Sequence, residues 1–245
     1  MNAATPTEPN DAGSATLTDI AYSRLSDDIL SGRLLPDTKL AIEHLRRDYG
    51  IGASPLREAL SRLAADGLVT VIGQRGFRVA PATVADLRDI TRLRILLETE
   101  ALRESLCSGD EDWEAAVVAA WYRLSKIEPE RGQRFPEWEQ RNHEFHEALV
   151  AACRSPRLLQ LRAALYDQHR RYRSIAVHYR SADRDVSGEH EAIYRACLER
   201  RIDDACELSR VHIQHTADLV AEVLAANSAL PQPARGRGRP RKVAG

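Results

Sequence analysis

Residues 52–73 read GASPLREALSRLAADGLVTVIG, and this stretch decides the fold of the first part of the chain. Serine is a favoured N-cap and proline suits the first helical position, so Ser54 and Pro55 predict the start of a helix. A β-rich run at 68–72 follows directly, and a Gly-Gln-Arg-Gly turn separates it from a second run at 77–79. We therefore expect a short helix that leads straight into a β-hairpin.

Two further helical patterns precede this stretch, at about 17–30 and 41–48. The first ends at a Ser-Gly pair and the second before Gly50, as helices commonly do. Three short helices followed by a hairpin is the element order of a winged helix-turn-helix, a DNA-binding fold.

The helix beginning at Ser54 has two different faces. Leucines and alanines form one stripe that anchors it to the other helices, so the opposite face is free to enter a DNA major groove. An arginine there can contact guanine or phosphate, and small serines allow close approach. The alternative is an ordinary solvated helix with no ligand. The predicted DNA-binding residues are Ser54, Arg57, Ser61 and Arg62 on the helix, with Arg75 and Gly76 at the hairpin tip.

Beyond Pro81 the pattern is helical throughout, which predicts a mainly α protein with a C-terminal antiparallel helical bundle. The expected helices are 83–108, 110–127, 135–153, 156–179, 185–200 and 203–226. The expected domains are a disordered N-terminus at 1–16, the winged helix at 17–80, an all-helical domain at 81–226, and a flexible basic tail at 227–245.

Charge is unevenly distributed, although the formal net charge is only −1. The winged-helix segment has nine Arg and Lys against eight Asp and Glu, and the tail at 231–245 has five basic residues and no acid. Both segments therefore tolerate a polyanion. No apolar run reaches the length of a membrane span or a signal sequence, and the four cysteines form no CxxC pair. These features predict a cytoplasmic protein with no membrane partner.

Histidines form the second group of candidate functional residues. Asn142 and His146 are four residues apart on one helix face, His190 begins a later helix, and His212 lies on the last expected helix. Three imidazoles and an amide oxygen between helices suit Zn²⁺ or a similar divalent ion. The alternative is ordinary, partly buried histidines, because ligands on separate helices have no fixed register.

The chain resembles the GntR family of bacterial transcription regulators at residues 29–36, 40–45 and 50–68. The family pattern G-V-S-R-T-P-V-R-E-A-L-x-x-L-x-x-x-G-L-V is matched at Pro55, Arg57, Glu58, Ala59, Leu60, Leu63, Gly67, Leu68 and Val69. Asp37 stands where glycine is usual, and Gly52-Ala53 where Ser-Arg is usual. The resemblance implies DNA binding, but the missing arginine leaves the operator sequence open. One winged helix offers too little interface for tight specificity, so we expect a dimer on a pseudo-palindromic operator.

Residues 81–226 resemble the FCD ligand-binding domain of the FadR-type branch, in which D-x-x-F-H is followed by E-H and a later His. Phe145-His146, Glu189-His190 and His212 match, and Asn142 replaces the aspartate. The resemblance implies a zinc-type site at Asn142, His146, His190 and His212, with His215 as an alternative ligand.

The same resemblance implies that residues 81–226 form an effector-binding and dimerisation domain, and that the effector is a small carboxylate. Arg94 is the residue expected to hold its carboxylate, unless Arg94 is an exposed arginine paired to Glu98. Similarity of residues 109–114, 124–126 and 137–138 to the glutarate-responsive branch suggests glutarate or a related acid.

Residues 235–242 resemble an AT-hook, whose Gly-Arg-Pro core lies in an A·T-rich minor groove. A plain solubilising tail is the alternative. The favoured function is a metabolite-responsive transcription regulator, a repressor released by its effector, and not an enzyme. The rival interpretations are a metal-dependent enzyme on the helical domain and an architectural DNA-binding protein that uses the tail.

Overall fold

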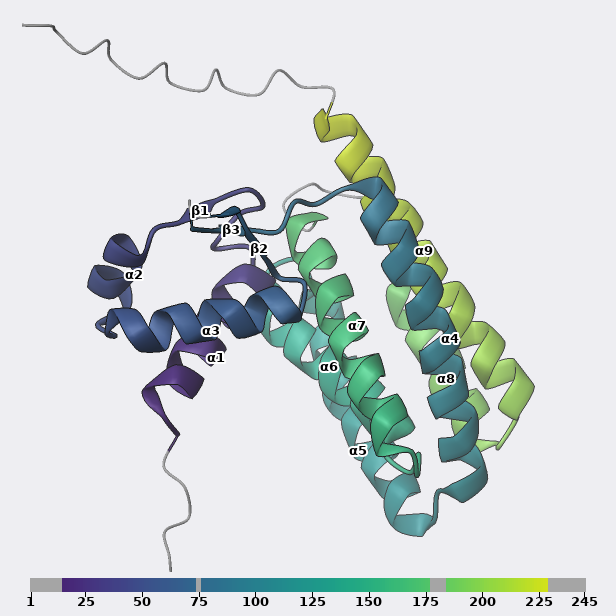
Figure 1. Ribbon diagram of the computed structural model, residues 1–245. Helices are drawn as coiled ribbons and strands as arrows, with labels where there is room; N and C mark the ends of the chain where they lie inside the picture. The colour runs from purple at the N-terminus through teal and green to yellow at the C-terminus, as the bar shows by residue number, and fades with distance from the viewer. Residues whose placement is uncertain (1–14, 74–75, 177–183, 229–245) are drawn as a thin grey trace, which may run out of the picture. The chain divides into compact units, whose positions relative to one another are not determined.

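The computed structural model describes residues 15–73, 76–176 and 184–228 (Figure 1). Residues 1–14 of the expected disordered N-terminus, the wing residue Arg75 and the basic tail beyond Ser228 lie outside these residues. The chain divides into two compact units, the N-terminal unit Met1–Pro81 and the helical unit Ala82–Gly245.

The N-terminal unit contains three helices and three short strands: α1 (Leu17–Leu30), β1 (Lys39–Leu40), α2 (Ile42–Tyr49), α3 (Ala53–Ala65), β2 (Val69–Val71) and β3 (Phe77–Val79). A capping box between Thr16 and Asp19 begins α1. The apolar stripe of α3, including Leu56, Leu60 and Leu63, is fully buried against α1 and the sheet. This is the expected winged helix-turn-helix.

The sheet has one strand more than the sequence predicted. β1 pairs antiparallel with β3, and the strand order is β1-β3-β2. The strand has only two residues, Lys39 and Leu40, so it shows no alternating pattern that could be detected in the sequence.

The N-cap of α3 is Gly52, and not Ser54 as predicted. Ser54 and Pro55 lie inside the first turn instead. The first amide groups of a helix have no intrahelical partner, so proline is tolerated at more than one position there and does not fix the starting residue.

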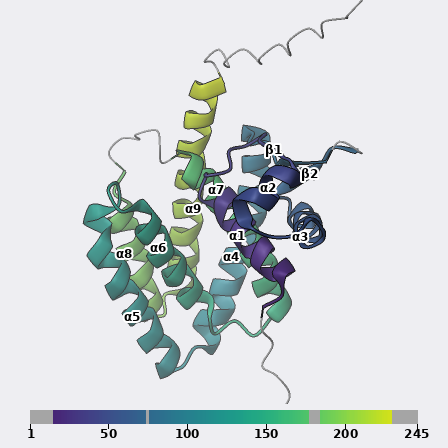
Figure 2. The same ribbon diagram turned by 90° about the vertical axis from the view of Figure 1, so that its left-hand side faces the viewer.

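The helical unit consists of α4 (Val84–Ser108), α5 (Glu111–Ile127), the 3-10 helix η2 (Glu128–Glu130), α6 (Phe135–Val150), α7 (Pro156–Ala176), α8 (Val186–Leu198) and α9 (Ile202–Ser228). Its main core is lined by α4, α5, α6 and α8, and Figure 2 shows α5 beside α6 and α8. A smaller core joins α4, α7 and α9. Among the described helices, none has an apolar stretch that would cross a bilayer.

Candidate functional site

The exposed face of α3 is the candidate DNA-reading surface. Ser54, Arg57 and Ser61 are all exposed, and the Ser61 hydroxyl donates to the Arg57 carbonyl at 2.9 Å. Within the described part of the chain, the Arg57 guanidinium has no hydrogen-bond or ion-pair partner. It is therefore available to a ligand.

Arg62 is differently placed from Arg57. Its Nη1 lies 2.8 Å from Asp19 Oδ1 on α1, and its guanidinium lies 4.5 Å from the ring centroid of Tyr22. These contacts tie Arg62 to the neighbouring helix, so it is a weaker candidate for DNA than Arg57.

The wing turn retains one predicted residue in the described chain. Gly76 has a φ of +103°, which L side chains rarely adopt, and its carbonyl accepts from the Ile72 amide at 2.8 Å. Glycine is therefore required here by the turn itself, before any DNA contact is considered.

Three histidines from three helices meet inside the helical unit. His146 comes from α6, His190 from α8 and His212 from α9, and one ring nitrogen of each lies within 4.8 Å of the others. They are 1%, 0% and 7% exposed. The structure thus brings together the three imidazoles that the sequence suggested.

Asn142 lies one turn before His146 on the same face of α6 and is also buried. Its amide nitrogen donates to the Tyr166 hydroxyl at 3.1 Å, which leaves the amide oxygen Oδ1 without a partner among the described groups. His215 differs from these residues, because its side chain is 53% exposed and pairs with Glu189 at 3.2 Å.

Two carboxylates orient two of the three histidines, each through contact with the Nδ1 atom of the ring. Glu128 Oε1 lies 2.6 Å from His190 Nδ1, and Glu189 Oε2 lies 2.8 Å from His212 Nδ1. Trp138 Nε1 fixes Glu128 by donating to its other oxygen at 3.0 Å, and Arg184 forms an ion pair with Glu189. A carboxylate behind a ligating histidine sets the tautomer and directs the other ring nitrogen forward.

The donor set fits a divalent metal ion. Burial, with the nearby His212 and His190, holds the pKa of His146 well below its ordinary value, and burial also lowers the pKa of His212. These imidazoles are therefore neutral and carry lone pairs at neutral pH. His146 Nδ1, His190 Nε2 and Asn142 Oδ1 are buried without a described hydrogen-bond partner. Buried polar atoms without partners are costly, and coordination would satisfy them.

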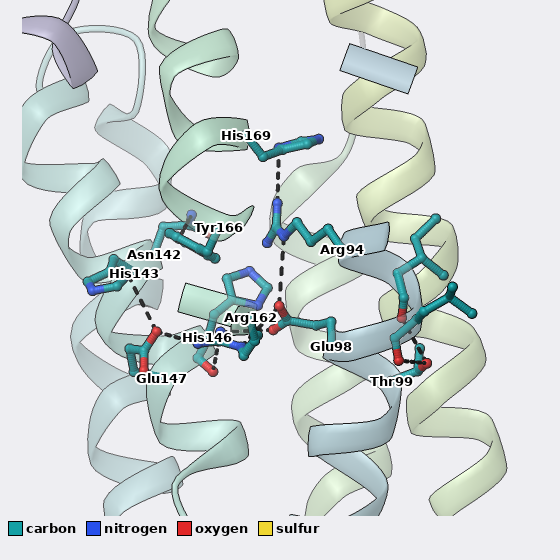
Figure 3. Close-up of polar contacts among 12 residues, drawn as sticks. Arg94, Glu98, Thr99, Asn142, His143, His146, Glu147, Arg162, Tyr166 and His169 are labelled. Carbon is teal, nitrogen blue, oxygen red and sulfur yellow. Dashed lines mark hydrogen bonds and ion pairs between the residues drawn. The ribbon is translucent and has the colours of Figure 1, made fainter. Parts of the chain in front are cut away.

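Three arginines lie near the buried Tyr166 ring beside the histidines, and Figure 3 shows two of them, Arg94 and Arg162. The guanidiniums of Arg94, Arg173 and Arg162 lie 4.5, 5.0 and 5.5 Å from the ring centroid. The Tyr166 ring is in turn 6.0 Å from the His146 ring. Cationic groups and the histidine cluster are therefore close neighbours.

Two of these arginines have dedicated carboxylates. Arg162 forms a fork with Glu98 at 3.1 and 2.9 Å, and Arg173 pairs with the buried Glu139. Each charge is thus balanced within the fold, as buried ions require.

Arg94 is the exception. It is 2% exposed, and its nearest described carboxylate oxygen, on Glu98, is 3.7 Å from Nε and already bonded to Arg162. Its Nε has no described hydrogen-bond partner, while Nη1 meets His169 Nδ1 at 2.9 Å. Burial lowers the pKa of Arg94 to about 10, so the guanidinium remains charged at neutral pH. The alternative interpretation, an exposed arginine paired to Glu98, is wrong about exposure.

Most of the residues that support these side chains could not be found from the sequence. Glu189 was visible because it precedes His190 in the family pattern. Glu128, Arg162, Tyr166, Arg173 and His169 carry no local signal, since each becomes adjacent only through helix packing.

A winged helix-turn-helix joined to a helical domain with a buried histidine cluster and a buried arginine defines an effector-controlled transcription regulator. Residues 17–79 match the gntR family of bacterial regulatory proteins, and residues 89–215 match the FCD domain. The chain belongs to the gntR family, and the predicted family, fold class and regulatory function are confirmed.

Known relatives agree with this assignment. The chain is 41% identical over 212 residues to an uncharacterized HTH-type transcriptional regulator, BphR, of Paraburkholderia xenovorans LB400, covering 84% of this chain and 86% of the relative. It is 36% identical over 212 residues to the HTH-type transcriptional repressor GlaR of Escherichia coli K12, covering 84% and 96%. These relatives are regulators, so the rival interpretation as an enzyme is rejected.

Solved structures share the fold. Escherichia coli McbR/YncC aligns with a TM-score of 0.75 at 18% identity, over 86% of this chain and 99% of that one. A GntR regulator from Rhodococcus sp. RHA1 aligns with a TM-score of 0.69 at 19% identity, over 84% and 97%.

Proposed function

We propose that the protein is a homodimeric cytoplasmic repressor that leaves its operator when a small carboxylate binds in the helical unit. The single observation that carries the effector part is Arg94, a buried cation without its own carboxylate, beside the cluster of His146, His190 and His212. Such a cation is stabilised by an anionic ligand. A carboxylate matches the planar guanidinium fork.

The proposed metal ligands are His146, His190 and His212, with Asn142 as a weaker fourth. Zinc suits three imidazoles, and it would supply positive charge beside Arg94 when bound. Glu128 and Glu189 hold two of the imidazoles in the required tautomer, and burial keeps water away from the site. An amide in place of a carboxylate removes one negative charge from the site, so metal affinity is expected to be lower than in relatives with aspartate.

The effector class is proposed to be a small mono- or dicarboxylate, with glutarate as the first compound to test. Arg94 would hold one carboxylate of the effector. Binding there is proposed to change the spacing of the two winged-helix domains of the dimer. Such coupling between sites is typically about 1–3 kcal/mol.

The proposed operator contacts are Arg57, Ser54 and Ser61, with Gly76 shaping the wing. One helix offers few base contacts, so tight specificity requires two winged-helix domains bound to a pseudo-palindromic site. The cytoplasmic location follows from the proposed contact with operator DNA.

The DNA part is tested by fluorescence anisotropy on a duplex obtained by in vitro selection. Arg57→Ala should weaken specific binding by about 1–3 kcal/mol for each bidentate hydrogen-bond pair that it removes, with the fold unchanged. Arg123→Ala, on α5 of the helical unit, is the matched control and should bind as the parent does. Equal affinity of the Arg57 variant and the parent would remove Arg57 from the reading surface.

A further inference from the structure

The imidazole of His169 on α7 is 0% exposed and is in contact with two buried guanidiniums. Arg94 Nη1 lies 2.9 Å and Arg173 Nη1 lies 3.2 Å from the same ring nitrogen, Nδ1. A guanidinium offers only N–H donors, so Nδ1 is the acceptor in both contacts.

These two contacts fix the tautomer of His169. Burial, and then the positive charges of Arg94 and Arg173, hold the pKa of His169 well below its ordinary value, so the ring is neutral at neutral pH. A neutral imidazole carries one hydrogen, and because Nδ1 is an acceptor, this hydrogen is on Nε2. His169 therefore has an N–H donor at the ring nitrogen that is not in contact with Arg94 (Figure 3).

This donor has no acceptor within the described part of the chain. The Nε2 atom is buried and has no hydrogen-bond partner there. The charges that act most strongly on the ring belong to Arg94, Arg173, His212 and Arg184, and none of these side chains is a carboxylate. A buried donor without an acceptor is costly, and a ligand that accepts from it removes the cost.

The unpaired donor lies next to the proposed effector site. Arg94 is in direct contact with the ring, and His212 of the histidine cluster is near enough to lower the pKa of His169. The two nitrogens of an imidazole point in different directions, so an acceptor at Nε2 and the Arg94 contact lie on different edges of the ring. A single small group cannot reach both, whereas a ligand with two acceptor groups several bonds apart can.

We propose that His169 determines effector specificity, and that the effector is a dicarboxylate whose second carboxylate accepts a hydrogen bond from His169 Nε2. This inference rests on the proposed function, because Arg94 holds the first carboxylate. A charged acceptor forms a stronger hydrogen bond than a hydroxyl does. A monocarboxylate of the same length leaves the donor unpaired, and a 2-hydroxy acid places its second oxygen too close to the first.

Pairs of acids with equal numbers of carbons separate the two roles: succinate with butyrate, glutarate with pentanoate, and adipate with hexanoate. Isothermal titration calorimetry on the full chain with zinc present measures their affinities. The parent should bind one of the diacids at least about tenfold more tightly than its monocarboxylate partner, the usual effect of a hydrogen bond to a charged group.

His169→Asn keeps an oxygen acceptor near the position of Nδ1 but has no group at the position of Nε2. It should lose this preference while binding the monocarboxylate as the parent does, whereas Arg94→Gln should weaken both acids. His44→Asn, on the exposed side of α2 in the N-terminal unit, is the matched control and should keep the parental preference. Circular dichroism checks that each variant is folded.

If His169→Asn is unfolded, the imidazole nitrogen NMR spectrum of the parent takes its place, and the diacid should shift an Nε2–H signal that its monocarboxylate partner leaves unchanged. The role of His169 would be overturned by a parent without preference in any pair, by a preference that His169→Asn retains, by an equal loss of both acids, or by an unshifted signal. Each of these results leaves a carboxylate effector at Arg94 in place. If no acid of either kind binds the parent, both the role of His169 and the proposed function are overturned.

Discussion

Glu128 Oε1 lies 2.6 Å from Nδ1 of His190, and the two side chains are 5% and 0% exposed. The pair joins a 3-10 helix to α8 and leaves His190 Nε2 directed at the other two histidines, with no described partner of its own. The same carboxylate accepts from Trp138 Nε1 at 3.0 Å, which holds it in place behind the His190 ring. This arrangement is explained by the need to orient a metal ligand.

Glu128→Gln should therefore weaken zinc binding by about 10–100-fold, the usual cost of losing an outer carboxylate. Glu130→Gln on the same 3-10 helix is the matched control, because Glu130 is half exposed and pairs with Arg134. Isothermal titration calorimetry with Zn²⁺ measures both. Equal affinities of the two variants would show that Glu128 does not serve the metal site.

The three histidines should act as one metal-binding unit, so that loss of any one of them releases the ion. His190→Ala and His212→Ala should each lose the metal, and the double variant should be little worse than either, because the shared ion is already gone. Elemental analysis of the purified proteins checks metal content. Additive losses of stability, with no metal in the parent, would mean that these residues are packed core histidines.

Asn142→Asp should tighten metal binding by supplying a negative oxygen where Asn142 Oδ1 now lies without a described partner. Calorimetry with Zn²⁺ compares the variant with the parent. Asn142→Leu, which removes the oxygen, should shift the affinity in the opposite direction. If aspartate and leucine bind zinc equally, position 142 does not coordinate the ion.

Stability should fall as the solution is acidified. Burial, with the charges of Arg94 and Arg173, holds the pKa of His169 well below the ordinary value near 6.5. The unfolded chain therefore takes up this proton first. The contribution of His169 is fully present above about pH 6.5 and is lost as the pH drops toward the folded-state pKa, at no more than about 1.4 kcal/mol per pH unit.

Urea denaturation between about pH 7.5 and 5.5, with a chelator present, measures this slope. His169→Gln keeps an acceptor for Arg94 and should give a flatter pH profile than the parent. Parallel profiles for the His169 variant and the parent would show that His169 does not contribute to the pH dependence of stability.

Asp37 has a φ of +63°, in the left-handed region that favours glycine. Asp37→Gly should stabilise the β1–β3 pairing by up to about 1 kcal/mol, and Asp37→Val should destabilise it by about 1–2 kcal/mol. Hydrogen exchange of the Val79 amide, which donates to the Thr38 carbonyl at 2.9 Å, reports this pairing directly. Protection that is equal in the glycine and valine variants would show that the turn carries no strain.

Most of the helices could be predicted from the sequence because their signals are local. The span of α1 is reproduced from its apolar spacing and its Ser-Gly end, and α4 and α5 begin within one residue of their expected starts. The Asn142–His146 pair was visible for the same reason, since four residues of one helix fix a common face.

The missed features depend on contacts between distant segments. β1 is defined by its pairing with Phe77 and Arg78, and nothing in Lys39-Leu40 itself indicates a strand. Arg162 reaches Glu98 across 64 residues of sequence, and Glu128 reaches His190 across 62. Arg94 is recognised as lacking its own carboxylate only after Arg162 has been paired with Glu98 and Arg173 with Glu139.

The proposed regulation requires that a carboxylate bound at Arg94 and the histidine cluster controls operator affinity. The most direct measurement is the anisotropy of the selected operator duplex with zinc present, titrated with glutarate and then with a panel of small mono- and dicarboxylates. Arg94→Gln, which keeps a donor but removes the charge, serves as the comparison. We expect an acid of this class to weaken operator binding by about 5–150-fold in the parent, and the Arg94 variant to bind DNA as tightly but without response. An operator affinity that no acid of the panel changes, or an equal response in the Arg94 variant, would contradict the claim.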